Sequence, residues 1–212
     1  MAEALHRSVT VSRQVGSGGS YIAYLLAKEL GFKYVDREIL RRAAEHLGTE
    51  PGLLDHYEER ASGFVETVLT SFNLGVSEMA YVPPLQPPIY NRDLFKLESR
   101  IMNDVADRYN AVIVGRGGYY ALRGRSDVTH VFIHAPEEFR IKRFMQVQRI
   151  TDVQQARKKL RDLDRRRTNF AKVILGINWT DARNYHLSID TGEVGFSESV
   201  ALIKDVVEAS AK

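Results

Sequence analysis

The segment Val9–Tyr21 reads VTVSRQVGSGGSY and carries, in order, the signals of a strand, a tight turn and a helix start. Its first residues, Val9–Ser12, are β-branched and apolar, which is typical of a short strand buried in a parallel sheet. The next residues are rich in glycine, and from Tyr21 to Leu30 apolar side chains recur on one helical face. Gly31 follows at the position where a helix commonly ends. The segment therefore predicts a strand, a glycine-rich turn and a helix.

A turn of this kind is suited to holding phosphate. Its backbone N–H groups point inward, and the helix N-terminus adds partial positive charge. Compared with the phosphate-loop pattern GxxxxGK[ST], the segment keeps Gly18 and Ser20, but Arg13 replaces the first glycine and Gly19 replaces the lysine. The residues expected to bind phosphate are Gly16, Ser17, Gly18, Gly19 and Ser20. The hydroxyl of Ser20 is also expected to bind magnesium. The alternative is a turn that only packs the helix against the strand.

Four further short apolar segments alternate with helical ones along the chain. Because strands that alternate with helices form parallel sheets covered on both faces, the sequence predicts an α/β fold with a five-stranded parallel sheet in three layers. The predicted strands after the first are Lys33–Val35, Ala111–Val114, Thr129–His134 and His186–Asp190.

The domain organisation follows from the same pattern. Residues 1–49 and 106–212 are expected to form the core, and residues 50–105 a helical insertion interrupted by the proline-rich stretch 83–88. Within the core, the segment 146–180 contains a basic helix that begins after the N-cap pair Thr151-Asp152. It carries seven Lys/Arg against two Asp between Arg157 and Arg167, a concentration that favours either an anionic partner or a solvated face.

The composition is that of a globular protein. Of 212 residues, 44% are apolar and 27% are charged, and the formal net charge is +3. There is no cysteine, which excludes disulfides and cysteine-bound zinc and suits a reducing compartment. No signal peptide or membrane-spanning stretch is apparent, so we expect a cytoplasmic protein. His130 and His134 alternate on a strand and are expected to pack rather than to bind metal.

The chain resembles the cytidylate kinase-like family. The resemblance covers nearly the whole sequence and is weakest over residues 50–105. It is carried by VTVSRQVGSGGSYIA at 9–23, LGFKYVDREI at 30–39, VIVGRG at 112–117, VFIHAPEE at 131–138, the pair Asp164 and Arg167, GINW at 176–179 and YHLSID at 185–190. It implies a P-loop nucleoside monophosphate kinase, with residues 50–105 as the acceptor-binding insertion and residues from about 146 to 180 as a basic lid. The implied reaction is magnesium-dependent transfer of the γ-phosphoryl group of ATP to CMP or dCMP.

The resemblance also implies roles on the donor side of this reaction. Because charge on the transferred phosphoryl group must be neutralised, arginines of the lid are expected to close over the phosphates. Arg161 and Arg167 are expected to act in catalysis, and Arg165 to bind ATP. Arg13, at the end of the first strand, is a second candidate for the charge that the missing lysine would supply. Asp36 is expected to bind a magnesium-bound water or to orient the attacking oxygen, or to cap the helix that follows it.

On the acceptor side, Arg116 corresponds to an arginine that contacts the monophosphate, and Arg42 to another, with Arg41 adjacent. Asp164 corresponds to an acid that recognises the cytosine amino group. An equally good reading is an ion pair with Arg161 or Arg167 on the same helix.

Three other readings remain open. The chain could be a non-catalytic nucleotide-binding relic, because Val114 and Gly117 replace the aspartates that flank the Gly-Arg motif in cytidylate kinases. It could be a kinase of another small acceptor. Nucleic-acid binding through the basic helix is less favoured, because no aromatic residues are interleaved there. Monomer and homodimer are both compatible with the sequence.

Overall fold

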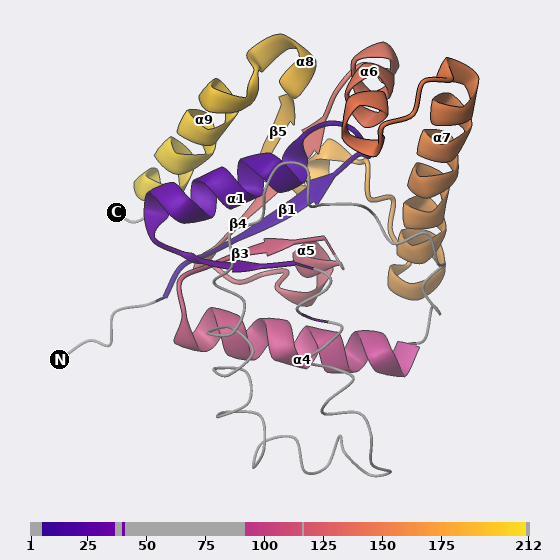
Figure 1. The fold of residues 1–212 in the computed structure, drawn as a ribbon. Coiled ribbons are helices and arrows are strands. Elements are labelled where there is room, and N and C mark those ends of the chain that lie inside the picture. Colours follow the sequence, from indigo (N-terminus) through magenta and orange to yellow (C-terminus); the bar gives the residue numbers. More distant parts are fainter. Residues whose placement is uncertain (1–5, 37–39, 41–91, 116, 211–212) are drawn as a thin grey trace, which may run out of the picture.

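The structure is a computed structural model that describes residues 6–36, 40, 92–115 and 117–210. Within these residues, five parallel strands form one sheet in the order β2-β3-β1-β4-β5 (Figure 1). The predicted α/β architecture and its five strands are confirmed. The strands are β1 (Ser8–Arg13), β2 (Lys33–Val35), β3 (Ala111–Val114), β4 (Val128–His134) and β5 (Leu187–Asp190).

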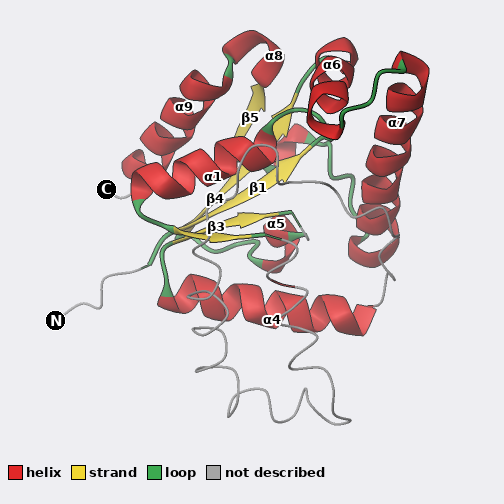
Figure 2. Cartoon of the chain, in the orientation of Figure 1, coloured by secondary structure: helices red, strands yellow, loops and turns green. Residues whose placement is uncertain are grey.

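Helices pack on both faces of the sheet and give three layers (Figure 2). The described helices are α1 (Gly19–Leu30), α4 (Arg92–Arg108), α5 (Gly118–Ala121), α6 (Glu137–Gln148), α7 (Val153–Phe170), α8 (Thr191–Val194) and α9 (Phe196–Ala209). A π-helical turn (Ala171–Leu175) extends α7, and a 3₁₀ turn (Ala182–Asn184) precedes β5.

One face of the sheet is covered by α1 and α9. Side chains alternate along a strand, so Val9 and Val11 of β1 point to this face with Val112 and Val114 of β3. They pack against Ile22 of α1 and its neighbours, and these residues are almost completely buried.

The opposite face is covered by α4 and α5. Ile101 and Met102 of α4 share an apolar cluster with Val35 of β2 and Ile113 of β3. This helix falls largely within the range 50–105 that the sequence predicts as an insertion. Its apolar side nevertheless belongs to the core beneath the sheet. Residues 41–91 lie outside the described part of the chain, so the division into domains stays a prediction.

Two helix boundaries follow from local chemistry that the sequence already displays. Gly31 adopts φ 66° and its N–H bonds the carbonyl of Ala27, which ends α1. Asp152 caps α7 by accepting hydrogen bonds from the N–H groups of Gln154 and Gln155. None of the described helices is long and apolar enough to cross a membrane.

His130 is buried on β4, as the sequence predicts. It is 4% exposed, its ring stacks on that of His186 at 5.1 Å, and its Nδ1 lies 2.7 Å from the hydroxyl of Thr10. Burial, assisted by the nearby His186, lowers the pKa of His130 from 6.5 to about 4.

This buried imidazole predicts an acid-sensitive fold. Between pH 6.5 and 4 the unfolded chain protonates His130 while the folded chain does not. As the pH is lowered from 6.5 to 4, the free energy of unfolding should therefore decrease, by up to about 3 kcal/mol from this group. Denaturant unfolding at a series of pH values measures the slope. His130→Phe should flatten it, whereas the half-buried His6→Asn should not. An equal slope in His130→Phe and wild type would contradict the prediction.

Candidate phosphate-binding site

The turn between β1 and α1 requires glycine at two positions. Gly16 and Gly18 adopt φ 80° and 81°, a left-handed conformation that other residues rarely take. A Cβ atom on Gly16 would lie 2.5 Å from the carbonyl oxygen of Arg140, and one on Gly18 would lie 2.6 Å from the ring of Phe196. The turn is therefore both unusual in backbone and closely packed.

The rest of the turn is anchored by hydrogen bonds to the sheet. The N–H of Gln14 and the hydroxyl of Ser17 both donate to the carbonyl of Ile133 on β4, at 3.0 and 3.3 Å. The hydroxyl of Thr191 donates to the carbonyl of Ser17 at 2.7 Å. Among the described residues, none accepts a hydrogen bond from the N–H groups of Gly18, Gly19 or Ser20 at the start of α1. A rigid turn that presents open N–H groups at a helix N-terminus can bind an anion.

Arg13 lies beside this turn and is only 8% exposed. Its Nε donates to the hydroxyl of Ser20 at 3.2 Å. A Cβ atom on Gly19 would lie 2.5 Å from the Cβ of Arg13, and one on Gly115 would lie 1.9 Å from its Nη1. The arginine therefore crosses from the end of β1 past the start of α1 to the end of β3. It occupies the space into which a side chain at position 19 would point.

A pocket opens between this turn and the helices that follow β4. The turn contributes residues from Arg13 to Tyr21, α6 contributes Arg143, Phe144, Val147 and Gln148, and α7 contributes Arg167. The guanidinium of Arg143, one of the lining residues, lies over the ring of Phe196, 4.5 Å from its centroid.

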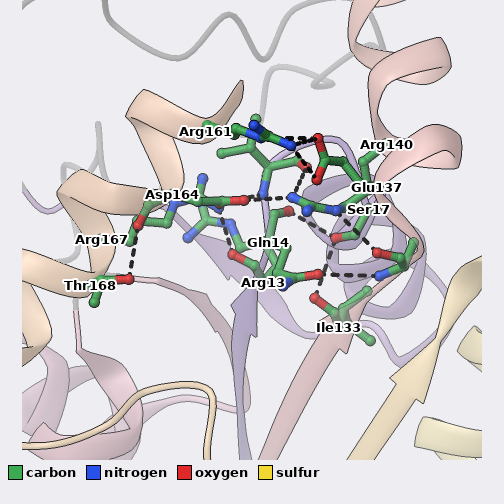
Figure 3. Close-up of polar contacts among 12 residues, drawn as sticks. Arg13, Gln14, Ser17, Ile133, Glu137, Arg140, Arg161, Asp164, Arg167 and Thr168 are labelled. Carbon is green, nitrogen blue, oxygen red and sulfur yellow. Dashed lines mark hydrogen bonds and ion pairs between the residues drawn. The ribbon is translucent and has the colours of Figure 1, made fainter. Parts of the chain in front are cut away.

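Two of the predicted α7 residues reach the turn (Figure 3). Arg167 donates to the carbonyl of Arg13 at 2.5 Å. Asp164 accepts a hydrogen bond from the N–H of Val15 at 2.9 Å and forms an ion pair with Arg140 at 2.5 Å. It also lies 3.6 Å from Arg167, so the ion-pair reading of Asp164 matches its position. In the structure, its two carboxylate oxygens are directed at protein groups.

The other two predicted lid arginines do not reach the turn in the structure. Arg161 pairs with Glu137 at 2.9 Å, where α6 begins, and Arg165 pairs with Asp162 on its own helix at 2.7 Å. Both arginine side chains are mostly exposed. Their roles in catalysis and ATP binding stay predictions, and each would require the arginine to leave a carboxylate.

Asp36 follows β2 and is 9% exposed. Its carbonyl accepts a hydrogen bond from the N–H of Leu40 at 3.1 Å. Arg42 and Arg116 lie outside the described residues, so the acceptor side of the predicted site is not placed.

Arg140 and Glu137 organise the site but do not stand out in the sequence. Both lie on α6, and each forms an ion pair with a residue of α7 that is more than 20 positions away in the chain. A helical pattern identifies such residues as polar, but it does not reveal which polar residue becomes buried. Only the packing of α6 on α7 does so.

Comparison with known proteins agrees with the fold and the motifs. The family model described as "Cytidylate kinase-like family" matches residues 8–193. The chain is 24% identical over 202 residues to a protein named cytidylate kinase from Methanosarcina mazei, covering 95% of this chain and 96% of that protein.

Two solved structures share the fold. One is an uncharacterized protein from Eubacterium ventriosum, with a TM-score of 0.71, 17% identity and coverage of 96% of this chain and 99% of that one. The other is TT1252 from Thermus thermophilus, with a TM-score of 0.51, 14% identity and coverage of 97% and 98%. The predicted three-layer P-loop kinase fold is confirmed. Because the family model spans most of the sequence, the chain belongs to the cytidylate kinase-like family.

Proposed function

We propose that the protein is a magnesium-dependent kinase that transfers the γ-phosphoryl group of ATP to a nucleoside monophosphate, CMP or dCMP. The observation that carries the proposal is the position of Arg13. Its Nε donates to the Ser20 hydroxyl, and its Cβ occupies the space of a side chain at position 19, where the phosphate-loop pattern has a lysine. Family membership and the similarity to a cytidylate kinase support nucleotide chemistry at this place.

The donor side of the reaction needs positive charge near the β- and γ-phosphates. The turn offers N–H groups, and Arg13 offers a planar guanidinium that can hold two phosphate oxygens. Arg167 contacts the backbone of Arg13 and lines the same pocket, so it can add a second positive charge. These groups can orient the γ-phosphoryl group and stabilise its charge during transfer.

Magnesium is proposed to bind through Ser20. Mg²⁺ is usually held by one or two protein oxygens together with substrate phosphates, and the Ser20 hydroxyl is an oxygen ligand at the turn. It accepts a hydrogen bond from Arg13 and has a further lone pair available. When bound, Mg²⁺ neutralises phosphate charge and orients the phosphate oxygens.

The acceptor is proposed to lie near the ends of β2 and β3. Parallel α/β sheets bind ligands beyond the carboxyl ends of their strands, where the connections diverge to either side. Asp36 follows β2 and Arg116 follows β3, with Arg42 further along. We propose that the two arginines bind the acceptor phosphate and that Asp36 orients the attacking oxygen. Arg161 and Arg165 would contribute on closure, after leaving Glu137 and Asp162.

A coupled assay tests the reaction directly. With ATP and Mg²⁺, a panel of nucleoside monophosphates should give ADP formation with CMP and dCMP above all others. The melting temperature should rise more with both ligands than with either alone, since each binds only the folded state. Turnover with a non-nucleotide acceptor alone would identify a different kinase. Nucleotide binding without turnover on any acceptor would identify a relic.

The position of Arg13 predicts how it can be exchanged with Gly19. Arg13→Gly should lower turnover at least a hundredfold, or ~3 kcal/mol of barrier. Gly19→Lys alone should lower the melting temperature, because its Cβ would collide with that of Arg13. The double variant Arg13→Gly/Gly19→Lys restores the GxxxxGK pattern and should recover at least about tenfold of the lost turnover.

The control for this exchange is Arg123→Gly, which removes an exposed arginine from a turn. Steady-state kinetics and melting curves should match wild type for this variant. If Arg13→Gly kept full activity and Arg167→Ala lost it, Arg167 of α7 rather than Arg13 of β1 would supply the charge of the absent lysine.

The proposed role of Arg116 predicts that its removal affects the KM of the two substrates differently. Arg116→Ala should raise the KM for the monophosphate at least about tenfold, since it removes a charge-assisted contact to the acceptor phosphate. The KM for ATP should change much less. Titration of each substrate at saturating levels of the other measures both values. An equal rise in the two would argue against an acceptor role.

A further inference from the structure

Val15 ties the phosphate-binding turn to the α6–α7 pair. Its side chain is 5% exposed and lies in an apolar cluster separate from the sheet core. The buried partners come from both helices and are Ile141, Phe144, Ala156 and Leu160. Ala156 and Leu160 are completely buried, so the first half of α7 packs firmly on α6 and on this residue of the turn.

The ion pair between Asp164 and Arg140 bonds both the N–H and the carbonyl of Val15. Asp164 accepts from the N–H of Val15 at 2.9 Å, and Arg140 donates through Nη1 to its carbonyl at 3.2 Å. The same Nη1 donates to the other carboxylate oxygen of Asp164 at 2.5 Å. The Nε of Arg140 donates to the carbonyl of Ala135 at 3.1 Å, so the residue that follows β4 also anchors the pair.

This pair is not an ordinary surface salt bridge. The side chains of Arg140 and Asp164 are 10% and 19% exposed, and both also bond backbone groups. A shielded, hydrogen-bonded pair keeps its geometry better than an exposed one, which water and salt weaken. Asp164 comes from the basic segment, but Arg140, its main partner, comes from α6.

The position of Val15 determines the shape of the turn that follows it. Gly16 packs against the carbonyl of Arg140, and the open N–H groups begin two residues later at Gly18. Arg167, one turn after Asp164 on α7, holds the carbonyl of Arg13 just before the turn. Two residues on one side of α7 therefore bond the backbone at the entrance to the phosphate-binding turn.

We propose that Asp164 and Arg140 are positioning residues. Together they clamp the backbone of Val15 and hold the turn in its phosphate-binding shape while α7 is docked. The inference rests on the proposed function for the identity of the nucleotide. It gives Asp164 a role on the ATP side of the site, whereas the family resemblance implies a contact with the acceptor base.

The test compares ATP and CMP in variants of the pair. Isothermal titration gives the Kd for ATP, and kinetics gives KM for each substrate. Asp164→Ala should raise the Kd for ATP at least about tenfold, because the N–H groups of the turn would no longer be held in position for the phosphates. It should leave the KM for CMP nearly unchanged. Asp164→Asn should have a smaller effect, since its amide oxygen still accepts from Val15.

A double variant separates positioning from stability. Asp164→Ala leaves the Arg140 charge buried without its partner, so this protein should melt earlier or fail to fold. Arg140→Met/Asp164→Leu replaces the pair by apolar side chains and should regain melting temperature without regaining ATP affinity. Recovery of both would show a purely structural pair and overturn the proposal. Asp205→Ala, an exposed carboxylate on α9, is the control and should bind ATP as wild type does.

The remaining outcomes are also decisive. Amide hydrogen exchange at Val15 should be faster in Asp164→Ala and in the double variant than in wild type, a readout that needs no nucleotide. Unchanged exchange and unchanged ATP affinity would overturn the clamp. A rise in the KM for CMP alone would assign Asp164 to the acceptor base. If wild type exchanges slowly at Val15 but binds no nucleotide, the contact exists and the proposed function fails together with the role inferred from it.

Discussion

The end of β1 and the start of α1 approach so closely that only one of positions 13 and 19 can carry a side chain in this geometry. A Cβ on Gly19 would lie 2.5 Å from the Cβ of Arg13. A second glycine, Gly115 at the end of β3, leaves room for the guanidinium itself. Two glycines on different loops thus accommodate one arginine. The usual pattern takes the phosphate-binding cation from the helix, whereas we propose that this chain takes it from Arg13 on the central strand of its sheet.

The turn beside this arginine is held by several layers of the protein at once. The sheet contributes the carbonyl of Ile133, the C-terminal region contributes Thr191, and α6 and α7 hold Val15. The basic helix is consequently less free than its composition indicates. Among the described residues, Arg157, Arg161, Arg165 and Arg167 of this helix each have a carboxylate partner. The pairs of Arg157 and Arg161 with Glu137 join this helix to α6, whereas those of Arg165 and Arg167 lie within the helix.

Much of the fold could be predicted because its signals are local. The five strands are short apolar segments, Gly31 ends a helix through its left-handed conformation, and Asp152 begins one through its side chain. The position of the phosphate-binding turn follows from the same local signals. What could not be predicted depends on how distant helices pack. The direction of Arg161 toward Glu137 and the burial of Arg140 are set by the contact of α6 with α7. The spacing of polar and apolar residues in the two segments does not indicate this contact.

The hydrogen bond from Thr191 to the carbonyl of Ser17 joins residues 174 positions apart, and the bond from the N–H of Val15 to the carboxylate of Asp164 joins residues 149 apart. The turn follows residue 13, whereas two of its supports lie at residues 164 and 191. During synthesis on the ribosome, the glycine-rich segment emerges long before the groups that shape it. Contacts of such sequence separation form late, because a long loop must close before they can stabilise anything. The shape of the turn therefore depends on residues as late as Thr191, and a nascent protein that stops short of β5 has the glycine-rich motif without this contact.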